Sequence, residues 1–471
     1  MMSSIIYQIL IEHAFAIFGF LLATYFIWRV LNEHRRPGGA ISWILIIIFA
    51  PYIGVPLYFI LGKRKWVRKA HSKIPLYSQS SIPQEKKNFI NPVEKVLITA
   101  GAPQIRSADS IYLSLDGTEA YLQLLKLIAS AKHYIYCTTF ILGNDEVGKS
   151  IIDALTKKAK EGIKVYLLLD SLGCFYLPRK TIKPLTEAGG KVSFFLPILP
   201  LRRKWSANLR NHRKIVVIDG HTAIVGGMNL SENFMGPKPN PKRFLDCAVF
   251  ITGEPVKDIE EIFLRDWEFS TDENISIYPE KKPEITSTTQ HLKSLVQVVA
   301  SGPDVPEDTI YDAILTACME AKERIWILTP YFVPDEPILK TLILQIRAGV
   351  DVSILLPKVS NHITADYARG PAIRELLDNG ANIWFYPKGM IHAKLLIFDR
   401  FLAITGSPNL DIRSMYLNFE IALFHYSPME IDCISGWFSQ LTNDSEMVKS
   451  LPANKLHIFL ENLSSLIAPL I

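Results

Sequence analysis

The sequence predicts a membrane-anchored α/β protein, in which two transmembrane helices precede two similar halves. Three observations support this prediction. Two long apolar runs lie within the first 61 residues. From about residue 108, apolar strand-like segments alternate with helical patterns, as expected of an α/β domain. The pattern H-x-K-x4-D-x6-G-[GS]-x-N occurs twice, once in each half, which indicates a duplicated domain.

The first two predicted elements are transmembrane helices over about 12–31 and 40–61. Each apolar run is close to the roughly 20 residues that a helix needs to cross a bilayer. The first run lacks a basic segment before it and a small-residue cleavage site, which argues against a removable signal peptide. The second run contains three helix-breaking residues that predict a kinked or re-entrant segment: Pro51, Gly54 and Pro56. A buried hydrophobic hairpin is the alternative for this region.

Basic residues set the predicted orientation. Five Lys and Arg residues cluster at 63–69, directly after the second run, and two arginines lie between the runs at 35–36. The positive-inside rule then favours a main domain in the cytoplasm. The mean hydropathy of +0.17 fits a membrane protein. We therefore expect a multi-pass protein of the cell membrane.

Composition excludes several classes of protein. The net charge of +5 is modest for 471 residues and does not predict a nucleic-acid partner. The five cysteines are widely spaced and contain no C-x-x-C pair, so we expect reduced core residues and neither a disulfide framework nor a zinc site. They are Cys137, Cys174, Cys247, Cys318 and Cys433.

The two halves have the same order of predicted elements. In the first half, a helical pattern over 118–132 leads into an apolar segment at 133–142, and a helix from about 146 to 161 precedes an apolar strand at 163–170. The order recurs in 313–332 and 349–357. The predicted division is a membrane region (1–66), a linker (67–107), a first domain (108–278), a polar connector (279–295) and a second domain (296–471).

The repeated motif supplies the candidate active-site residues. Its first copy is His212, Lys214, Asp219, Gly226, Gly227 and Asn229, and its second copy is His392, Lys394, Asp399, Gly406, Ser407 and Asn409. A lone histidine before an apolar strand is more often a capped or surface residue. Two complete copies at the same relative spacing, 180 residues apart, instead favour one site built from both halves.

The spacing suggests how these residues act together. On a strand, a histidine and a lysine two positions apart project from one face about 6.6 Å from each other. Two histidines in one site can divide the roles of nucleophile and general acid, which a single histidine cannot supply at once. We expect the two lysines to stabilise negative charge on the bound substrate together with Asn229, Asn409 and Ser407.

The paired motifs resemble those of the phospholipase D superfamily, and within it the bacterial cardiolipin synthases. Further similar stretches are "QVVASGPD" (297–304), "TPYFVPD" (329–335) and "GSPNLDIRS" (406–414), so the resemblance covers essentially the full chain. It implies two phospholipase D-like domains, with mixed sheets flanked by helices, that form one active site at a pseudo-twofold interface.

The resemblance also implies residue roles. His212 is expected to attack as the nucleophile, and His392 is expected to act as acid and then as base. A carboxylate behind each imidazole, at Asp246 in "FLDCAVF" and Glu420 in "NFEIALF", holds the reactive tautomer.

Asp219 and Asp399 are expected among the catalytic residues because they belong to the motif. Their spacing is at odds with direct contact, since each lies an odd number of residues from its histidine and an unbroken strand would aim it away from the phosphate. Asp219 also opens an Asp-Gly turn. The spacing therefore argues for a supporting role.

The expected reaction is transfer of a phosphatidyl group between two phosphatidylglycerol molecules, giving cardiolipin and glycerol through a phosphohistidine. One phosphodiester replaces another, and the sequence has neither a Walker loop nor an acidic metal cluster, so we expect no cofactor and no metal. Expected partners are phosphatidylglycerol and other anionic membrane lipids. A membrane-bound phospholipase D, in which water resolves the intermediate, is the main alternative. A nuclease of the same superfamily fits the membrane spans less well, and a non-catalytic scaffold fits two complete motifs poorly.

Two further segments leave alternatives open. The basic run at 202–204, followed by Trp205, fits either a solvated loop or contact with anionic headgroups. The C-terminal stretch 457–471 fits either a core helix or an interfacial helix, and we expect core packing.

Overall fold

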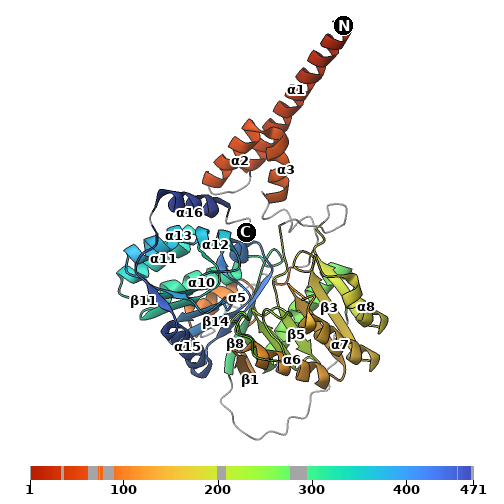
Figure 1. Cartoon of the computed structure of the whole chain (residues 1–471), viewed down its shortest axis with the longest axis vertical. Helices are drawn as coiled ribbons and strands as arrows, with labels where there is room; N and C mark the ends of the chain where they lie inside the picture. The colour runs from red at the N-terminus through yellow and green to blue at the C-terminus, as the bar shows by residue number, and fades with distance from the viewer. Residues whose placement is uncertain are drawn as a thin grey trace. The chain divides into compact units, whose positions relative to one another are not determined.

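The computed structural model describes residues 2–32, 37–61, 73, 75–77, 90–198, 208–275, 294–452 and 454–467 (Figure 1). The chain divides into an N-terminal unit that ends at His71 and a main unit that holds the rest, apart from Ser206–Asn208. The basic runs at 63–69 and 202–204 and Trp205 lie outside the described residues.

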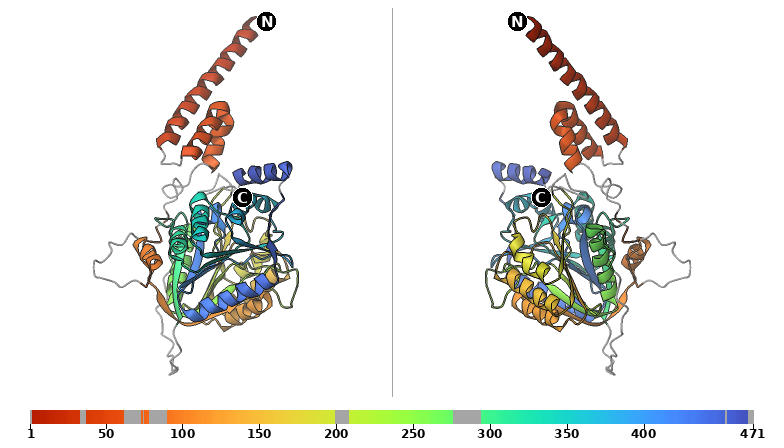
Figure 2. Two further views of the ribbon diagram at one scale, coloured as in Figure 1. Left: turned by 90° about the vertical axis from the view of Figure 1, so that its left-hand side faces the viewer. Right: turned by 90° about the vertical axis from the view of Figure 1, so that its right-hand side faces the viewer.

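The N-terminal unit consists of three helices: α1 (Met2–Asn32), α2 (Pro37–Phe49) and α3 (Pro51–Leu61). Within α1, Ile11–Asn32 is long and apolar enough to cross a membrane, and it is the one such helix among the described residues. Phe26, Ile47 and Tyr58, one from each helix, meet in a small apolar cluster. Figure 2 shows α2 and α3 against the C-terminal half of α1.

The second apolar run is not one transmembrane helix over 40–61, and it breaks at Pro51, one of the residues that predicted a kinked or re-entrant segment. A Cβ at Gly54 would lie 2.8 Å from the carbonyl oxygen of Ile46, whereas residues eight apart in one straight helix are separated by about 12 Å along its axis. The chain therefore folds back between α2 and α3. Pro51 is a physical cause, because it lacks the amide hydrogen that would continue the helix.

The main unit is organised around one 15-stranded sheet, with the strand order β17-β12-β11-β9-β13-β14-β16-β8-β1-β7-β6-β5-β2-β3-β4. The strands of the first half are β1 (Arg106–Ser114), β2 (Tyr134–Thr139), β3 (Lys164–Asp170), β4 (Lys191–Phe195), β5 (Ile215–Ile218), β6 (Thr222–Gly226) and β7 (Ala248–Gly253). Those of the second half are β8 (Ser294–Ser301), β9 (Arg324–Leu328), β11 (Asp351–Pro357), β12 (Asn382–Tyr386), β13 (Leu395–Phe398), β14 (Leu402–Gly406), β16 (Glu420–His425) and β17 (Glu446–Val448). A separate parallel pair joins β10 (Phe332–Val333) and β15 (Leu410–Asp411).

The helices of the main unit connect these strands. In and before the first half they are α5 (Pro92–Thr99), α6 (Gly117–Ser130), α7 (Glu146–Lys160), α8 (Arg179–Glu187) and α9 (Pro255–Thr271). In the second half they are α10 (Thr309–Glu320), α11 (Glu336–Arg347), α12 (Ile363–Ala368), α13 (Gly370–Asp378), α14 (Ile412–Tyr416), α15 (Pro428–Asn443) and α16 (Lys455–Ile467).

The expected duplication is present in the sheet. From the centre outward the first half runs β1-β7-β6-β5-β2-β3-β4, and the second half repeats this order as β8-β16-β14-β13-β9-β11-β12. Within each half the strands are mixed, since β2 is parallel to β3 but antiparallel to β5. The halves join through the antiparallel pairing of β1 with β8, so the two expected domains share one continuous sheet.

Alternating side chains give the sheet of the first half two apolar faces. Ile135, Cys137 and Leu167 belong to a core with residues of α6 and α7. On the other face, Tyr136 stacks on Phe263 of α9 with ring centroids 4.8 Å apart. Strands that are buried on both sides need near-continuous apolar sequence, which explains why 163–170 contains so few polar residues.

Parts of the expected linker and connector belong to the main unit. Asn91 caps α5 by accepting a 3.0 Å hydrogen bond from the Glu94 amide, and Tyr77 is buried with its hydroxyl 2.8 Å from the amide of Ala300. Strand β8 begins at Ser294, inside the expected connector 279–295, most of which lies outside the described residues. Amino-acid composition did not predict these contacts, because isolated residues make them.

Candidate active site

The two histidine–lysine pairs lie in irregular segments at one edge of the sheet. Strands β5 and β13 begin only at Ile215 and Leu395, after Lys214 and Lys394. The expectation that each pair lies on a regular strand is therefore wrong. Because Ile215 pairs with Thr138 near the end of β2, the first pair lies at the carboxyl edge of the parallel strands, where α/β sheets commonly bind ligands.

Each of these segments pairs with backbone of the other half. The amide of His212 donates to the carbonyl of Phe419 at 2.9 Å, and the amide of Phe419 donates to the carbonyl of Arg210 at the same distance. The second copy repeats this arrangement, because the amide of His392 donates to the carbonyl of Leu245 at 2.7 Å. Both contacts are single parallel bridges that cross the pseudo-twofold axis.

These bridges pair each histidine with a carboxylate of the opposite half. Nδ1 of His212 lies 3.0 and 3.1 Å from the two carboxylate oxygens of Glu420, which follows Phe419 in the chain. Nδ1 of His392 lies 2.7 Å from Oδ2 of Asp246, which follows Leu245. All four side chains are buried. A carboxylate on Nδ1 leaves Nε2 of each imidazole for chemistry.

The two lysines contact their histidines differently. Nζ of Lys214 donates to the backbone carbonyl of His212 at 2.8 Å. Nζ of Lys394 donates to the carbonyl of His392 and also lies 2.7 Å from its Nδ1 and 3.3 Å from its Nε2. The two halves of the site are therefore similar in composition but not equivalent in contacts.

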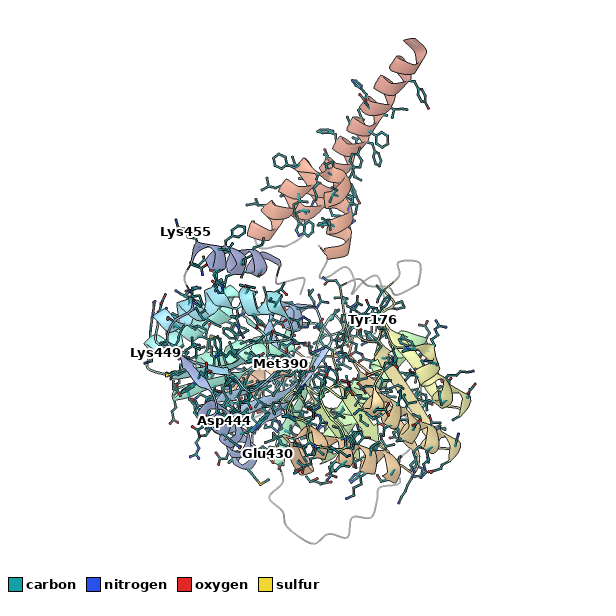
Figure 3. The ribbon with its side chains drawn as sticks, in the orientation of Figure 1. Tyr176, Met390, Glu430, Asp444, Lys449 and Lys455 are labelled. Carbon is teal, nitrogen blue, oxygen red and sulfur yellow. The ribbon has the colours of Figure 1, made fainter. Side chains whose placement is uncertain are left out.

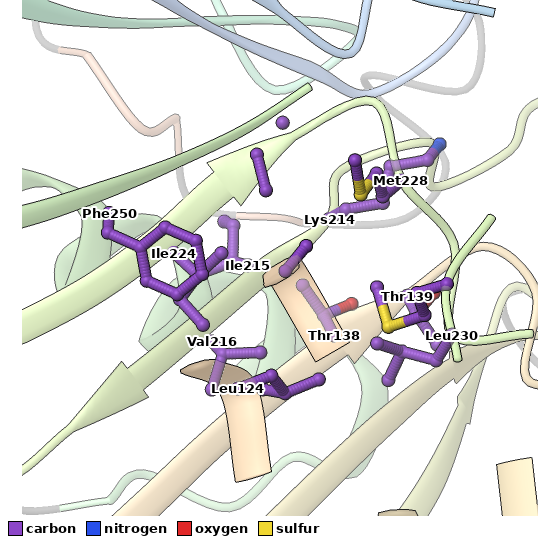
Figure 4. Close-up of a pocket in the computed structure, with 14 residues that line it drawn as sticks. Leu124, Thr138, Thr139, Lys214, Ile215, Val216, Ile224, Met228, Leu230 and Phe250 are labelled. Carbon is purple, nitrogen blue, oxygen red and sulfur yellow. The ribbon is translucent and has the colours of Figure 1, made fainter. Parts of the chain in front are cut away.

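Burial lowers the pKa of both lysines. An apolar cavity of about 30 Å³ lies beside Lys214, between α6 and the sheet, with Met228 and Leu230 in its wall (Figure 4). Burial lowers the pKa of Lys214 to about 7 and that of Lys394 to about 8, although Glu420 and Asp246 oppose the shift. Desolvation favours the neutral amine because an ammonium loses its hydration in such surroundings.

Burial acts in the same direction on the histidines. It lowers the pKa of His392 to about 3, with a further lowering by Lys394 and an opposing, raising effect of Asp246. It also lowers the pKa of His212, where Glu420 is the main opposing group. Each lysine lowers the pKa of the histidine in the other half as well, as expected of four groups in one site. The lowered pKa values favour the neutral form of both imidazoles.

Ser407 and its counterpart Gly227 fit the two different carboxylates. Oγ of Ser407 donates to Oε2 of Glu420. A Cβ at Gly227 would lie 2.3 Å from Oδ1 of Asp246, so that position excludes any side chain. The shorter aspartate therefore lies against a glycine, and the longer glutamate accepts a hydrogen bond from a serine.

The two asparagines of the motif lie close to the site but have different surroundings. Oδ1 of Asn229 accepts a 3.1 Å hydrogen bond from the amide of Ile141, which orders the chain next to Phe140. Oδ1 of Asn409 is buried without a hydrogen-bond partner among the described residues. A buried amide with unused capacity is available to a ligand.

Asp219 and Asp399 do not reach this site, which corrects their expected place among the catalytic residues. Asp219 follows β5 at its far end, has a φ of 52°, and accepts 2.8 Å hydrogen bonds from the amides of Lys132, His133 and Tyr134. Asp399, with a φ of 48°, does the same for residues 322–324. Both aspartates fix the turn that leads from a helix into a central strand, as their odd spacing had suggested.

A buried ionic network around Arg213 was missed in the sequence. Its guanidinium lies 2.7 Å from Asp266 on α9 and 3.2 Å from Asp304 of the second half, and Nε donates to the carbonyl of Glu420 at 3.1 Å. Lys73 pairs with the same two aspartates. The signal available in the sequence was an arginine between His212 and Lys214, where the second copy has Ala393.

Aromatic rings flank both histidines. The ring of Phe140 stands edge-on to His212 with centroids 5.2 Å apart, and that of Phe234 stands edge-on to His392 at 4.8 Å. These rings help to fix the imidazole planes. Among the described residues, no group of three or more His, Cys, Asp or Glu side chains is arranged to hold a metal ion.

The duplicated sheet and the shared site of two histidines and two lysines define a phospholipase D-like enzyme. The family description "Cardiolipin synthase, PLD-like domain" matches residues 124–267 and 314–442, and "Phospholipase_D-nuclease N-terminal" matches 21–63. The chain belongs to the cardiolipin synthase family, and it is an enzyme of the phosphatidyltransferase type.

Curated relatives match most of the chain. It is 32% identical to cardiolipin synthase 1 of Bacillus cereus, over 94% of this chain and 91% of that protein. It is 34% identical to a cardiolipin synthase of Clostridium perfringens, over 84% and 86% of the two chains. Among solved structures, phosphatidylserine synthase of Haemophilus influenzae has the same fold, with a TM-score of 0.62, 15% identity, and coverage of 81% of this chain and all of that one.

The position of Asp219 predicts a loss of stability that is separable from catalysis. Asp219→Asn leaves one of three backbone donors without an acceptor and should lower the free energy of unfolding by about 1–3 kcal/mol. Activity per folded molecule should fall less than about tenfold, whereas His212→Ala should cost several orders of magnitude. Thermal unfolding and turnover of the purified protein test this, with Asp399→Asn as the matched variant. An Asp219→Asn protein of unchanged stability and no activity would contradict the assignment.

The lowered lysine pKa values predict the pH dependence. A lysine that stabilises phosphoryl charge must be protonated, so kcat/KM should fall as the pH rises through about 7 to 8. Lys214→Arg and Lys394→Arg keep their charge, so their profiles should extend to higher pH even where the maximal rate is lower. The measurement is kcat/KM between about pH 6 and 10 on lipid in mixed micelles. An alkaline limb that neither arginine variant moves would rule out the lysines as its source.

Proposed function

We propose that this enzyme makes cardiolipin from two phosphatidylglycerol molecules and releases glycerol. The observation that carries the proposal is the crossed arrangement at the site, in which each imidazole is oriented by a carboxylate of the other half and accompanied by a lysine. Such a site offers one nucleophile and one acid–base group to a single phosphodiester. The cardiolipin synthases among its relatives support this substrate.

The reaction proceeds in two displacements. Nε2 of His212 attacks phosphorus of the first phosphatidylglycerol, and the glycerol alkoxide leaves with a proton from Nε2 of His392. Glycerol departs, and the neutral His392 removes a proton from a glycerol hydroxyl of the second phosphatidylglycerol. The new alkoxide attacks phosphorus, the P–N bond breaks, and cardiolipin forms with both histidines restored.

The different lysine contacts support this division of roles. Lys394 lies within 3.3 Å of Nε2 of His392, whereas Lys214 contacts His212 through its backbone carbonyl. A nitrogen next to an ammonium is a poor nucleophile but is well placed to exchange protons. The bound phosphodiester brings negative charge and raises the pKa of His392, which Asp246 then stabilises as imidazolium.

The remaining motif residues have supporting roles. Lys214 and Lys394 neutralise the phosphoryl oxygens, and the amide oxygen of Asn409, which is buried without a partner among the described residues, accepts a hydrogen bond from a substrate hydroxyl. Ser407 orients Glu420, and Asn229 orders the segment that carries Phe140.

We extend the proposal to the membrane. The apolar part of α1 crosses the bilayer, the α2–α3 hairpin enters it from one side, and the main unit lies in the cytoplasm among anionic lipids. We also propose that the connector 279–295 separates the first domain (108–278) from the second (296–471).

The product distinguishes this proposal from hydrolysis. Full-length protein in bilayers of labelled phosphatidylglycerol with EDTA should give cardiolipin and glycerol, because histidine and lysine supply the required charge. Phosphatidic acid as the main product would instead identify a phospholipase D. Strict dependence on a divalent metal or on CDP-diacylglycerol would contradict the mechanism. His212→Ala and His392→Ala should each abolish the reaction, and the double variant should be little worse because the residues act as a unit.

The covalent intermediate gives a further prediction. With His392→Ala, the first displacement lacks its acid and the second lacks its base, so an intermediate on His212 should form slowly and then persist. A phosphoramidate is stable in alkali and labile in acid, so mass spectrometry after alkaline work-up should find the adduct on a peptide containing residues 208–219. An adduct on His392 in the reciprocal His212→Ala variant alone would reverse the roles. Finding neither, together with no exchange of labelled glycerol into phosphatidylglycerol, would favour direct transfer between lipids.

A further inference from the structure

Helix α16 presents its apolar side to solvent and its polar side to the protein. Leu456 and Phe459 are 69% and 61% exposed, and Leu463 is also exposed. Glu461, on the opposite side, is only 2% exposed. An amphipathic helix on a soluble protein normally buries its apolar stripe, so this helix is oriented for apolar surroundings outside the protein. The expectation of core packing for this segment is not met by these residues.

The orientation of α16 is fixed by ionic contacts. Glu461 lies 2.9 Å from the guanidinium of Arg374 on α13 and 3.1 Å from Nε2 of His457. A Cβ at Gly370 would lie 2.3 Å from the Glu461 side chain, so the glycine leaves room for this contact. Breaking a buried ion pair leaves a buried charge without a partner, so rotation of the helix would cost free energy. The apolar face therefore stays outward.

Two loops at the edge of the sheet carry further exposed apolar side chains. The loop after β3 contains Phe175 and Tyr176, and Tyr176 is 90% exposed. The equivalent loop after β11 contains Val359, and Ile363 opens α12, with 72% and 71% of their surfaces exposed. Since β3 and β11 occupy the same place in the two halves, the two loops are related by the pseudo-twofold arrangement.

Both loops are tied directly to the active site. Asp170, at the end of β3, accepts hydrogen bonds from the amides of Leu172 at 2.8 Å and Asn211 at 2.9 Å, and Asn211 precedes His212. In the second half, the hydroxyl of Tyr331 donates to Asn361 at 2.6 Å, and its ring lies 6.5 Å from that of His392. The exposed loops thus border the edge at which the histidines lie.

The helix and the two loops lie at one end of the main unit. In Figure 3, Tyr176 and Lys455 lie at the same end, whereas Glu430 and Asp444 lie at the other. Helix α16 packs on α12, which begins with Ile363. Cations flank the apolar residues, because Arg179 and Lys180 follow the first loop and Lys455 opens α16, all three exposed.

We propose that α16 and these two loops form a membrane-docking rim that seats the active site on an anionic lipid surface. Apolar and aromatic side chains next to lysine and arginine match the boundary between acyl chains and anionic headgroups. Docking in this way brings a lipid phosphodiester to the histidines while its acyl chains remain in the bilayer. The identity of the headgroup rests on the proposed function, but the docking itself does not.

Lipid-borne quenching of a fluorescent probe tests the docking. In a Cys433→Ser background, where the other four cysteines are buried, Phe459→Cys, Tyr176→Cys and Met429→Cys are labelled with an environment-sensitive dye in the full-length protein. Met429 is the matched control, since it is apolar and exposed but follows β16 at the opposite edge of the sheet. In phosphatidylglycerol nanodiscs with doxyl lipids, probes at 459 and 176 should be quenched roughly twofold or more, and the probe at 429 should not.

Two outcomes of this experiment would overturn the proposal. Equal quenching at 429 would show that the labelled surfaces enter lipid without preference. A probe at 459 that is shielded from water but not quenched would show that a protein surface, such as a second copy of the chain, covers α16. The same labels on the inactive His212→Ala protein should give the same quenching, so the result does not depend on whether cardiolipin is the product.

An activity measurement completes the test. Phe459→Asn with Leu463→Asn should lower turnover of bilayer lipid about tenfold and leave turnover of a monomeric short-chain phosphatidylglycerol unchanged, because only the bilayer requires docking. Met429→Asn should change neither rate. An unchanged bilayer rate in the double variant, or an equal loss on both substrates, would contradict a docking role for α16.

Discussion

The pairing of each histidine with a carboxylate from the opposite half is the interaction on which the rest of the site depends. Glu420 orients His212 and Asp246 orients His392, so neither half contains a complete catalytic group. The pairing is set by the backbone bridges that join residue 211 to 419 and residue 245 to 391. The continuous sheet, formed where β1 meets β8, holds these segments in register. The two halves must therefore assemble before either imidazole is held in its reactive tautomer.

Burial excludes water from the site and also influences the protonation of its histidines and lysines. Burial lowers the pKa of both imidazoles and brings the pKa of both lysines close to neutral pH, because charged groups are poorly solvated in the site. In the proposed reaction, an anionic phosphodiester would reverse this balance when it binds, which would couple substrate binding to the proton needed by the leaving alkoxide. The halves are not equivalent. Arg213 joins the first motif to two buried aspartates, and the second motif has Ala393 in that position. A two-step reaction that needs one nucleophile and one acid–base group fits such an asymmetric frame.

Sequence reasoning was most accurate where it relied on repetition. The duplicated motif singled out both histidine–lysine pairs, which the structure brings together. The odd spacing of Asp219 and Asp399 argued for a supporting role, although the strand that it assumed begins only after each lysine. Sequence reasoning was less accurate where the chain departs from a regular helix or strand. The prolines and glycine of the apolar run over 40–61 predicted a kinked or re-entrant segment, but only the structure shows that the chain reverses at Pro51. The segments at His212 and His392 look like strand starts, yet they bond across to the other half before the strands begin. Such contacts have no local periodic signal.

By itself, the sequence predicted the α/β class, the duplication and the candidate reactive side chains, because hydrophobic period and motif spacing are local properties of the chain. The resemblance to the phospholipase D superfamily, and not the spacing, implied Asp246 and Glu420 as the supporting carboxylates. Only the tertiary structure decided that each carboxylate serves the histidine of the other half, 146 and 208 residues away in the chain. It alone showed that α16 turns its apolar side outward, since a helical pattern gives an apolar face but not its direction. Pairing between distant segments depends on sheet register and on the docking of whole elements, and neither property is encoded in a short stretch of sequence.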